Sequence, residues 1–284
     1  MPPSGSVLRL VRVFAYCALT FPLMPVQALL LLLRSPLAER LPRTYHRLVC
    51  RILGIVIERR GTVSLTRPTL FVANHTSYLD IEILGASIPG SFVSKADVDG
   101  WPVFGWLARL QRTVFIDRKR RSIRNQRDAL NARLQAGDRL ILFPEGTSGD
   151  GQRLLPFKSA LFGAVMEAAG HDITVQPVSV AYLRLDGMPL GRSYRPLFAW
   201  YGDMALAPHL WTMLGLGRLG VRVTFHPAVN AAAFASRKAL AEHCAAVIAG
   251  GLSAALTGRE MVAPAPPPLA PPAAPALADA VPTS

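Results

Sequence analysis

A histidine and an aspartate five residues apart, His75 and Asp80, are the side chains of this sequence best suited to general-base chemistry. An imidazole is neutral near pH 7 and can take a proton from a hydroxyl, especially when a carboxylate holds its other ring nitrogen. Ser77 lies nearby, but its position before an apolar segment fits a helix N-cap better than a nucleophile. The pair therefore predicts activation of a hydroxyl that belongs to a substrate.

The spacing of these two residues also arises by chance, and such a pair can be an ordinary hydrogen bond without catalysis. The surrounding residues place the pair at a strand end. The apolar run 69–73 stops at Asn74, a Thr-Ser turn follows, and a second apolar segment starts at Tyr78. This order predicts strand, loop and helix, a junction at which α/β proteins expose their functional side chains.

A second strand end carries the residues LFPEGTS at 142–148. Pro144 and Gly146 predict a tight loop whose backbone amides can face a bound group, and Glu145 could orient that group or the loop itself. A Pro-Glu-Gly turn alone is most often only a turn.

Basic residues follow two further predicted strands. Lys95 closes the strand 91–95, and Arg118 directly follows the strand 113–117, so both are candidate ligands for an anion. The neighbouring charges at 119–121 are equally well explained as a solvated helix start.

Strands and helices alternate along most of the chain, which predicts an α/β fold with a mixed, largely parallel sheet and flanking helices. The expected strands are 55–63, 69–73, 91–95, 113–117, 139–143, 175–182 and 221–225, and the expected helices are 41–54, 80–86, 101–110, 122–135, 157–169 and 236–256. The apolar segment 208–221, with Trp211, fits a lipid contact and a buried helix equally well.

An uncharged apolar run, 13–33, precedes this fold. As one helix it would be about 31 Å long, enough to cross a bilayer core. Pro22 and Pro25 interrupt the run, so it is either a kinked span or two short helices dipping into one leaflet. A signal peptide fits less well, because the run is long and no small-residue cleavage site follows Leu33. We expect a retained membrane anchor, and arginines on both sides of it leave its orientation open.

Composition agrees with a membrane setting. The net charge is +13 and 51% of the residues are hydrophobic, which favours an anionic membrane surface over nucleic acid as the partner. The three cysteines lie far apart, which suits a reducing compartment and suggests neither a disulfide framework nor a metal site. We expect membrane lipids as partners, no nucleic acid and no metal.

Four segments together resemble a known family. Residues 74–80 (NHTSYLD), 114–118 (VFIDR), 143–147 (FPEGT) and 176–178 (QPV) are similar, in order and spacing, to the four sequence blocks of the glycerolipid acyltransferases. This is the family of the 1-acylglycerol-3-phosphate acyltransferases, and the resemblance covers about residues 45–259.

The resemblance implies a mechanism. His75, held by Asp80, would deprotonate the free hydroxyl of a lysolipid, which attacks an acyl thioester of coenzyme A or acyl carrier protein. Backbone amides would stabilise the oxyanion, with no bound cofactor, metal or acyl-enzyme. Glu145, Gly146 and Thr147 would shape the acceptor site. Lys95 and Arg118 would face anionic groups.

The apolar run, the extent of the resemblance and the composition of the C-terminal segment together predict three parts. Residues 1–44 would be a membrane anchor and connector, 45–262 the acyltransferase domain, and 263–284 a disordered tail rich in proline and alanine. The enzyme would sit on the cytoplasmic membrane with its catalytic domain facing the cytoplasm.

One position departs from the family pattern. Ser148 stands where the family usually has an arginine, and Asp150 follows two residues later. Without a bidentate cation, binding of a phosphate monoester should weaken. Residues 109–115, 155–163 and 199–204 resemble the bacterial lyso-ornithine lipid acyltransferase branch, whose acceptor has an amine that Asp150 could pair with.

We therefore expect lyso-ornithine lipid as the acceptor. Three alternatives stay open: a 1-acylglycerol-3-phosphate acyltransferase, a non-catalytic lipid-binding protein on the same scaffold, and a hydrolase that activates water. The intact His75 and Asp80 argue against a binding protein, and the lack of a Gly-x-Ser-x-Gly elbow argues against a hydrolase.

Overall fold

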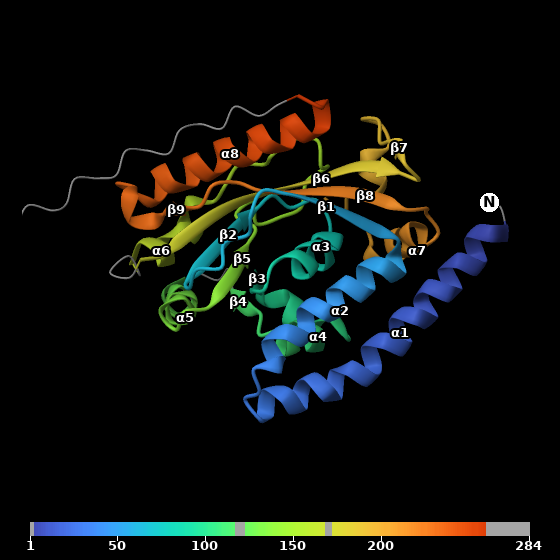
Figure 1. Cartoon of the computed structure of the whole chain (residues 1–284), viewed down its shortest axis with the longest axis horizontal. Coiled ribbons are helices and arrows are strands. Elements are labelled where there is room, and N and C mark those ends of the chain that lie inside the picture. The colour runs from blue at the N-terminus through green and yellow to red at the C-terminus, as the bar shows by residue number, and fades with distance from the viewer. Residues whose placement is uncertain (1–2, 117–122, 168–171, 260–284) are drawn as a thin grey trace, which may run out of the picture.

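A computed structural model describes residues 3–116, 123–167 and 172–259. Within these ranges the centre of the protein is a nine-stranded sheet of order β1-β8-β6-β2-β5-β3-β4, with β7 and β9 paired to β6 (Figure 1). The strands are β1 (Ile55–Arg60), β2 (Thr69–Ala73), β3 (Ser91–Lys95), β4 (Val114–Ile116), β5 (Arg139–Leu142), β6 (Thr174–Leu185), β7 (Met188–Pro189), β8 (Leu219–Phe225) and β9 (Val229–Asn230).

Most strand pairs are parallel. Strand β2 pairs in parallel with β5 and β6, β3 pairs in parallel with β5 and β4, and β1 pairs in parallel with β8. Strands β7, β8 and β9 each run antiparallel to β6. The predicted mixed, largely parallel sheet is confirmed.

Helices cover both faces of the sheet. They are α1 (Pro3–Leu32), α2 (Leu37–Leu53), α3 (Leu79–Ser87), α4 (Phe104–Leu110), α5 (Ile123–Gln135), α6 (Gly163–Glu167), α7 (Leu206–Leu214) and α8 (Arg237–Thr257). Figure 1 shows α8 on one side of the sheet and α2 and α3 on the other.

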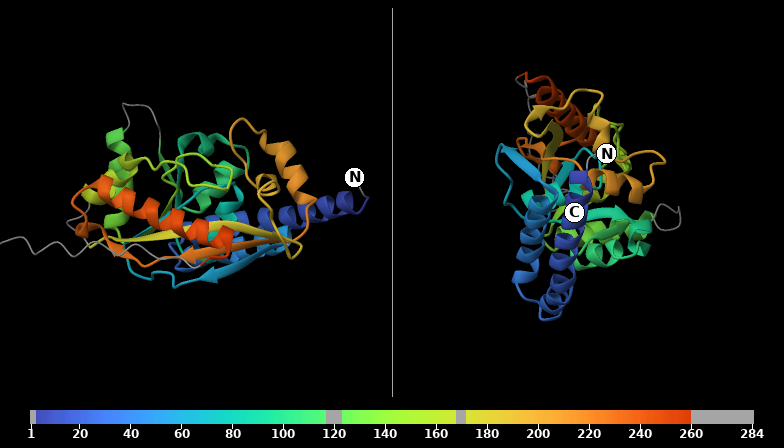
Figure 2. Two further views of the ribbon diagram at one scale, coloured as in Figure 1. Left: turned by 90° about the horizontal axis from the view of Figure 1, so that it is seen from above. Right: turned by 90° about the vertical axis from the view of Figure 1, so that its right-hand side faces the viewer.

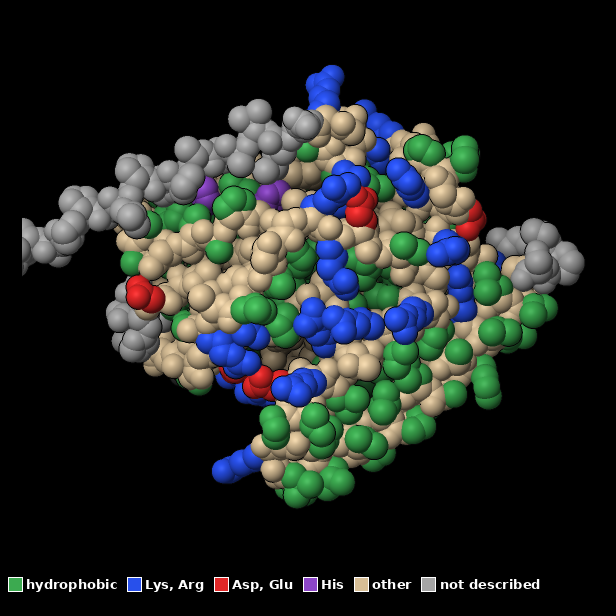
Figure 3. All heavy atoms as spheres, viewed as in Figure 1, with side chains coloured by type: hydrophobic (Ala, Val, Ile, Leu, Met, Phe, Trp, Pro, Cys, Tyr) green, Lys and Arg blue, Asp and Glu red, His purple; other side chains and the backbone are tan. Residues whose placement is uncertain are grey.

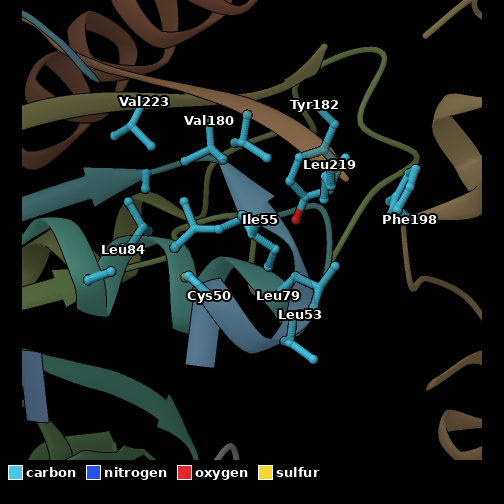
Figure 4. Close-up of a cluster of buried hydrophobic side chains, with 14 of the residues drawn as sticks. Cys50, Leu53, Ile55, Leu79, Leu84, Val180, Tyr182, Phe198, Leu219 and Val223 are labelled. Carbon is cyan, nitrogen blue, oxygen red and sulfur yellow. The ribbon is translucent and has the colours of Figure 1, made fainter. Parts of the chain in front are cut away.

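Strand β2 contributes side chains to the cores on both faces of the sheet, because successive side chains of a strand point to opposite sides. Phe71 and Ala73 join the core beneath α2 and α3, whereas Leu70 and Val72 join the core beneath α5, α6 and α8. Figure 4 shows part of the first core, with Leu53 of α2 and Leu79 of α3 below Ile55 of β1. Strand β2 is thus buried on both faces, which holds the loop that follows it in place.

Helix α1 is one continuous helix that contains Pro22 and Pro25, so the alternative of two short helices was wrong. It lies against the domain instead of projecting from it, and the right-hand view of Figure 2 shows α1 and α2 side by side. Arg12 donates from Nη1 to the carbonyls of Leu214 and Leu216, at 3.0 and 2.7 Å. Fifteen residues later, about 22 Å along a helix, Gln27 makes a second polar attachment, from its Nε2 to the carbonyl of Leu110 at 3.0 Å.

Two helices in the described parts of the chain are long and apolar enough to cross a membrane. They are residues 5–32 of α1 and helix α8. Leu240, Cys244 and Ile248 of α8 are buried in the second core, so α8 is a core helix.

Several predicted boundaries were wrong for local reasons. The strand expected at 55–63 ends at Arg60, because Gly61 takes a positive φ of 74°. The helix expected at 101–110 starts at Phe104, since the residue before Pro102 is extended. Strand β8 begins two residues before 221.

Two other segments also differ from expectation. The helix expected at 157–169 is a 3-10 turn, Ser159–Phe162, followed by α6. Part of the segment 208–221 belongs to α7, which buries Met213 and Leu214 and exposes Trp211. The expected tail, 263–284, lies outside the described residues.

Candidate active site

The residues expected to do chemistry gather where β2 and β5 end. These strands are parallel neighbours, so the loops after them leave the sheet at the same edge. His75 follows β2, Glu145 follows β5, and α3 starts beside them with Asp80 in its first turn.

His75 and Asp80 form the predicted pair. Nδ1 of His75 lies 2.9 Å from Oδ2 of Asp80, and the aspartate side chain is completely buried. The imidazole ring stacks on Phe143, with ring centroids 4.2 Å apart, and its side chain remains 20% exposed. Among the described residues, Nε2 of His75 has no hydrogen-bond partner, so this nitrogen is available to take a proton from a bound molecule.

Three further donors hold Asp80. Its Oδ2 accepts the backbone N–H groups of Thr76 and Ser77, at 2.6 and 3.0 Å, and its Oδ1 accepts the hydroxyl of Tyr182 at 2.8 Å. Burial, followed by the charge of Asp80, raises the pKa of Tyr182 well above its usual value, so this hydroxyl stays protonated as a donor. The prediction that Ser77 caps α3 was wrong: its side chain makes no capping bond, and Asp80 binds the amides of this loop instead.

Glu145 connects the two strand ends. Its Oε1 accepts the backbone N–H of His75 at 2.6 Å, and its Oε2 accepts the backbone N–H of Leu155 at 2.8 Å. Burial raises the pKa of Glu145 to about 7; the two backbone bonds oppose this shift, and the charge of Asp80 adds to it. Gly146 follows with a φ of +68°, a conformation that strains other residues, so the tight turn requires glycine here.

The exposed side of His75 opens into a cavity of about 560 Å³. Such a volume is typical of small-molecule sites. The cavity is lined by residues of β3, α1, α2, α3, α4 and α7. Lys95, Gly146 and Thr147 line it together with His75, so the structure brings these predicted site residues to one space. Ser148 lines the cavity as well.

One predicted site residue, Asp150, is placed differently, and another is not described. Asp150 is partly buried, its Oδ1 accepts the backbone N–H of Gln152 at 3.0 Å, and it is not part of the cavity lining. Arg118 lies outside the described residues. Ser148, at the position of the family arginine, donates its hydroxyl to the carbonyl of Trp200, so position 148 presents no cation to the cavity.

Sequence reasoning missed Tyr182 and the stacking role of Phe143. Tyr182 is the one side chain with a hydroxyl near the end of an otherwise apolar stretch, 180–183, which was a usable signal. Its meeting with Asp80 depends on strand pairing across 102 residues, which no local pattern reveals. In the described parts of the chain, no group of three or more His, Cys, Asp or Glu side chains could hold a metal ion.

Comparisons with known proteins agree with this geometry. The family model "Acyltransferase" matches residues 54–181. A lyso-ornithine lipid O-acyltransferase of Brucella abortus is 44% identical over 262 residues, which cover 90% of this chain and 98% of the relative. The chain belongs to the acyltransferase family. The resemblance predicted from the four blocks is confirmed.

This acyltransferase has further relatives. A lyso-ornithine lipid O-acyltransferase of Rhizobium meliloti is 43% identical, over 84% of this chain and 83% of the relative. A 1-acyl-sn-glycerol-3-phosphate acyltransferase of Neisseria meningitidis is 37% identical, over 60% of this chain and 64% of the relative.

The acyltransferase also shares its fold with a solved structure. This is the 1-acyl-sn-glycerophosphate acyltransferase of Thermotoga maritima, with a TM-score of 0.56 at 22% identity, over 91% of this chain and 98% of that one. The likeness confirms the predicted fold class.

Proposed function

We propose that this acyltransferase moves a fatty acyl group from a thioester to the free hydroxyl of lyso-ornithine lipid. The observation that carries the mechanism is the buried, four-donor Asp80 beside a histidine whose second nitrogen is open to the cavity. The acceptor follows from the relatives of that name, which match nearly the whole chain.

The reaction would begin with the acceptor hydroxyl at Nε2 of His75. As the hydroxyl oxygen attacks the thioester carbonyl, its proton moves to Nε2, and Asp80 stabilises the imidazolium that forms. The tetrahedral oxyanion would be stabilised by backbone amides of the loop 143–149. Collapse expels the thiolate, which takes the proton from His75, and the products are an ester and a free thiol. Coenzyme A and acyl carrier protein both supply such a thioester.

In this proposal Glu145 is a positioning residue rather than an acceptor ligand, because both of its oxygens bind backbone amides. Gly146 and Thr147 line the acceptor side of the cavity, and Lys95 faces an anionic group of a substrate. The carboxylate of lyso-ornithine lipid is such a group. Arg118 keeps its proposed role as a second anion ligand.

Asp150 keeps its proposed role as the partner of the acceptor amine. Its Oδ1 accepts the backbone N–H of Gln152, and its Oδ2 has no hydrogen-bond partner among the described residues, although the side chain is not part of the cavity lining. The absence of a cation at Ser148 supports an acceptor without a phosphate monoester.

Membrane association is proposed from α1. Large apolar side chains are exposed along it, and Figure 3 shows hydrophobic side chains gathered along this helix. They include Val7, Leu10, Val11, Phe14, Phe21, Leu29 and Leu32. The inner side of the same helix is attached to the domain at Arg12 and Gln27, so a perpendicular span would draw the charged domain into the bilayer. We infer that α1 lies in one leaflet with its apolar side in the lipid.

The organisation proposed for the enzyme keeps the predicted boundaries. Residues 1–44 would form the membrane anchor and connector, and 45–262 the acyltransferase domain. The free cysteines Cys17, Cys50 and Cys244 are consistent with a catalytic domain that faces the cytoplasm at the inner membrane.

The test is an acyl-transfer assay on purified enzyme in detergent. Labelled acyl groups on coenzyme A and on acyl carrier protein are offered with either lyso-ornithine lipid or 1-acylglycerol-3-phosphate. We expect transfer to lyso-ornithine lipid, and a Ser148→Arg variant should gain activity on the phosphate acceptor. Transfer by the wild type to the phosphate lipid alone would overturn the acceptor assignment.

Transfer to 1-acylglycerol-3-phosphate is the second candidate function. It is favoured by Lys95 on the cavity wall and by the Neisseria meningitidis relative, although that match covers less of both chains. The same assay decides between the two acceptors.

A further inference from the structure

Three aromatic rings meet in the wall of the cavity. The rings of Trp101 and Trp200 have centroids 6.2 Å apart and planes at 89° to each other. The rings of Tyr78 and Trp200 have centroids 6.1 Å apart and planes at 64°. All three side chains line the same cavity as His75, and each is only partly buried. We call Tyr78, Trp101 and Trp200 the aromatic group.

Backbone hydrogen bonds attach Trp200 to the loops of the active site. Its N–H donates to the carbonyl of Thr76 at 3.0 Å, and its carbonyl accepts the hydroxyl of Ser148. The indole is also held, because its Nε1 donates to the carbonyl of Met204 at 2.8 Å. Trp200 is therefore bound both to the residue that follows His75 and to the position at which the family usually has an arginine.

The cavity lining offers an ammonium group no carboxylate without a counter-charge. Among the residues that the structure describes, Glu82 is the only carboxylate in the lining, and its Oε2 is 2.6 Å from Nδ1 of His46. Nε2 of His46 is 2.9 Å from Oε1 of Gln111, so both ring nitrogens carry hydrogens and the histidine neutralises Glu82. Asp150 is not part of the lining. An ammonium group inside the cavity therefore needs another kind of contact.

Aromatic faces supply such a contact. The π electrons of a ring attract a cation that lies within about 6 Å of the ring centroid, and the attraction is strongest for tryptophan and grows where water is excluded. Two rings at nearly 90° form a corner in which one cation lies close to both centroids. The negative face of a ring repels an anion such as a phosphate monoester.

We propose that the aromatic group binds the ammonium group of the acceptor through its ring faces. The proposal deepens the proposed function and rests on it, since it takes the acceptor to carry an amine. Where the family usually has a cation, this chain has Ser148, whose hydroxyl holds Trp200. The exchange at position 148 thus replaces a contact for a phosphate with a contact for an ammonium group, and Lys95 keeps its proposed role toward the carboxylate.

The first experiment measures binding without acyl transfer. Three N-acyl amino acids that lack the reacting hydroxyl are titrated by calorimetry into the purified full-length protein in a nonionic detergent, with no thioester present. They are acyl-ornithine, its trimethylammonium derivative and acyl-norvaline, whose side chain carries no amine. We expect both cations to bind about tenfold more tightly than acyl-norvaline, because a ring face attracts a quaternary ammonium group as well as a primary one.

Two results would overturn the proposal. The first is that acyl-norvaline binds as tightly as acyl-ornithine, or that none of the three binds. The second is that the trimethylammonium derivative binds no better than acyl-norvaline, since the amine would then be held through its N–H groups by a hydrogen-bond acceptor such as Asp150.

Variants assign the preference for ornithine over norvaline to the rings. Trp101→Leu and Trp200→Leu should each reduce this preference at least about threefold, whereas Trp101→Phe keeps a ring and should retain most of it. Trp106→Leu is the matched control, because Trp106 is 61% exposed and is not part of the cavity lining. Melting temperatures identify a variant that fails to fold, in which case the other one decides. A preference that survives in both folded leucine variants would refute the assignment.

The two proposals fail separately. If both cations are preferred in the titrations but no acyl transfer to lyso-ornithine lipid occurs, the ammonium site stands and the proposed function does not. If acyl transfer to lyso-ornithine lipid occurs and neither cation is preferred, the ammonium site is wrong and the proposed function stands.

Discussion

Two histidine-carboxylate pairs use the same helix. Asp80 and Glu82 stand two residues apart in α3, and each contacts a histidine, His75 or His46, at less than 3 Å. In the first pair the carboxylate is completely buried and the histidine is partly exposed. In the second pair the histidine is buried and the carboxylate is the more exposed partner.

This reversal decides what each pair can do. His75 has one ring nitrogen engaged, so it can accept a proton at the other. His46 has both ring nitrogens engaged, so it can accept none without losing a bond. Burial opposes protonation of His46, but the charge of Glu82 and the two hydrogen bonds outweigh it and raise its pKa. A histidine beside a carboxylate is therefore a base only when its outer nitrogen remains free.

Among changes to the groups that hold His75, the largest effect should come from Asp80→Asn. An amide offers one acceptor oxygen in place of two, and it cannot stabilise the imidazolium of His75. We expect kcat to fall about 10²–10⁴-fold with KM changed little, measured in the acyl-transfer assay. A fall below threefold would show that His75 works without its carboxylate.

Glu145→Gln should have the next largest effect. The amide can accept one of the two backbone N–H groups, from His75 and Leu155, and would present an N–H to the other. The unpaired group costs about 1–3 kcal/mol and shifts the backbone of His75. We expect a drop in kcat of about ten- to a hundredfold, together with a lower melting temperature. Full activity in a normally stable variant would show that the Glu145 bonds do not position His75.

Glu82→Gln should change the free energy of unfolding more than it changes kcat. We expect the free energy of unfolding to fall by about 1–3 kcal/mol, because His46 would lose its counter-charge. The pKa of His46 is raised in the folded protein, so the stabilisation by this pair is complete below the ordinary value of 6.5 and disappears as the pH rises through the folded value.

The stability difference between wild type and Glu82→Gln should therefore be largest on the acid side and narrow at higher pH. Glu145 also has a raised pKa, about 7, and it destabilises the fold as pH rises above its ordinary value of 4.5. Its contribution is the same in both proteins and cancels in the difference. Chemical denaturation of both proteins over a pH series measures the stability difference between them. A difference that does not change with pH would contradict a charged His46.

The smallest effect should come from Tyr182→Phe. It removes one of four donors to Asp80 and leaves the other three in place. We expect kcat to fall about three- to tenfold, since a single hydrogen bond to a charged group is lost. A loss as large as that of Asp80→Asn would show that Tyr182 takes part in the proton transfer.

The sequence predicted the first pair and missed the second for a physical reason. His75 and Asp80 lie in one strand-loop-helix junction, so spacing and local structure were enough to bring them together. His46 and Glu82 are 36 residues apart and meet because α2 packs on α3. Tyr182 likewise reaches Asp80 through the β2–β6 pairing. Alternating elements predicted the sheet well, because periodicity is local, whereas Asp150 was assigned from its place in the sequence and is absent from the cavity wall.

The most direct test of the central claim compares His75→Gln with His46→Gln in one acyl-transfer assay, with melting temperatures measured beside it. We predict that His75→Gln loses at least about a hundredfold in kcat and melts like the wild type. His46→Gln should melt at a lower temperature and keep kcat within tenfold. Substantial activity in His75→Gln, or a larger loss of kcat in a folded His46→Gln, would contradict the assignment of His75 as the base.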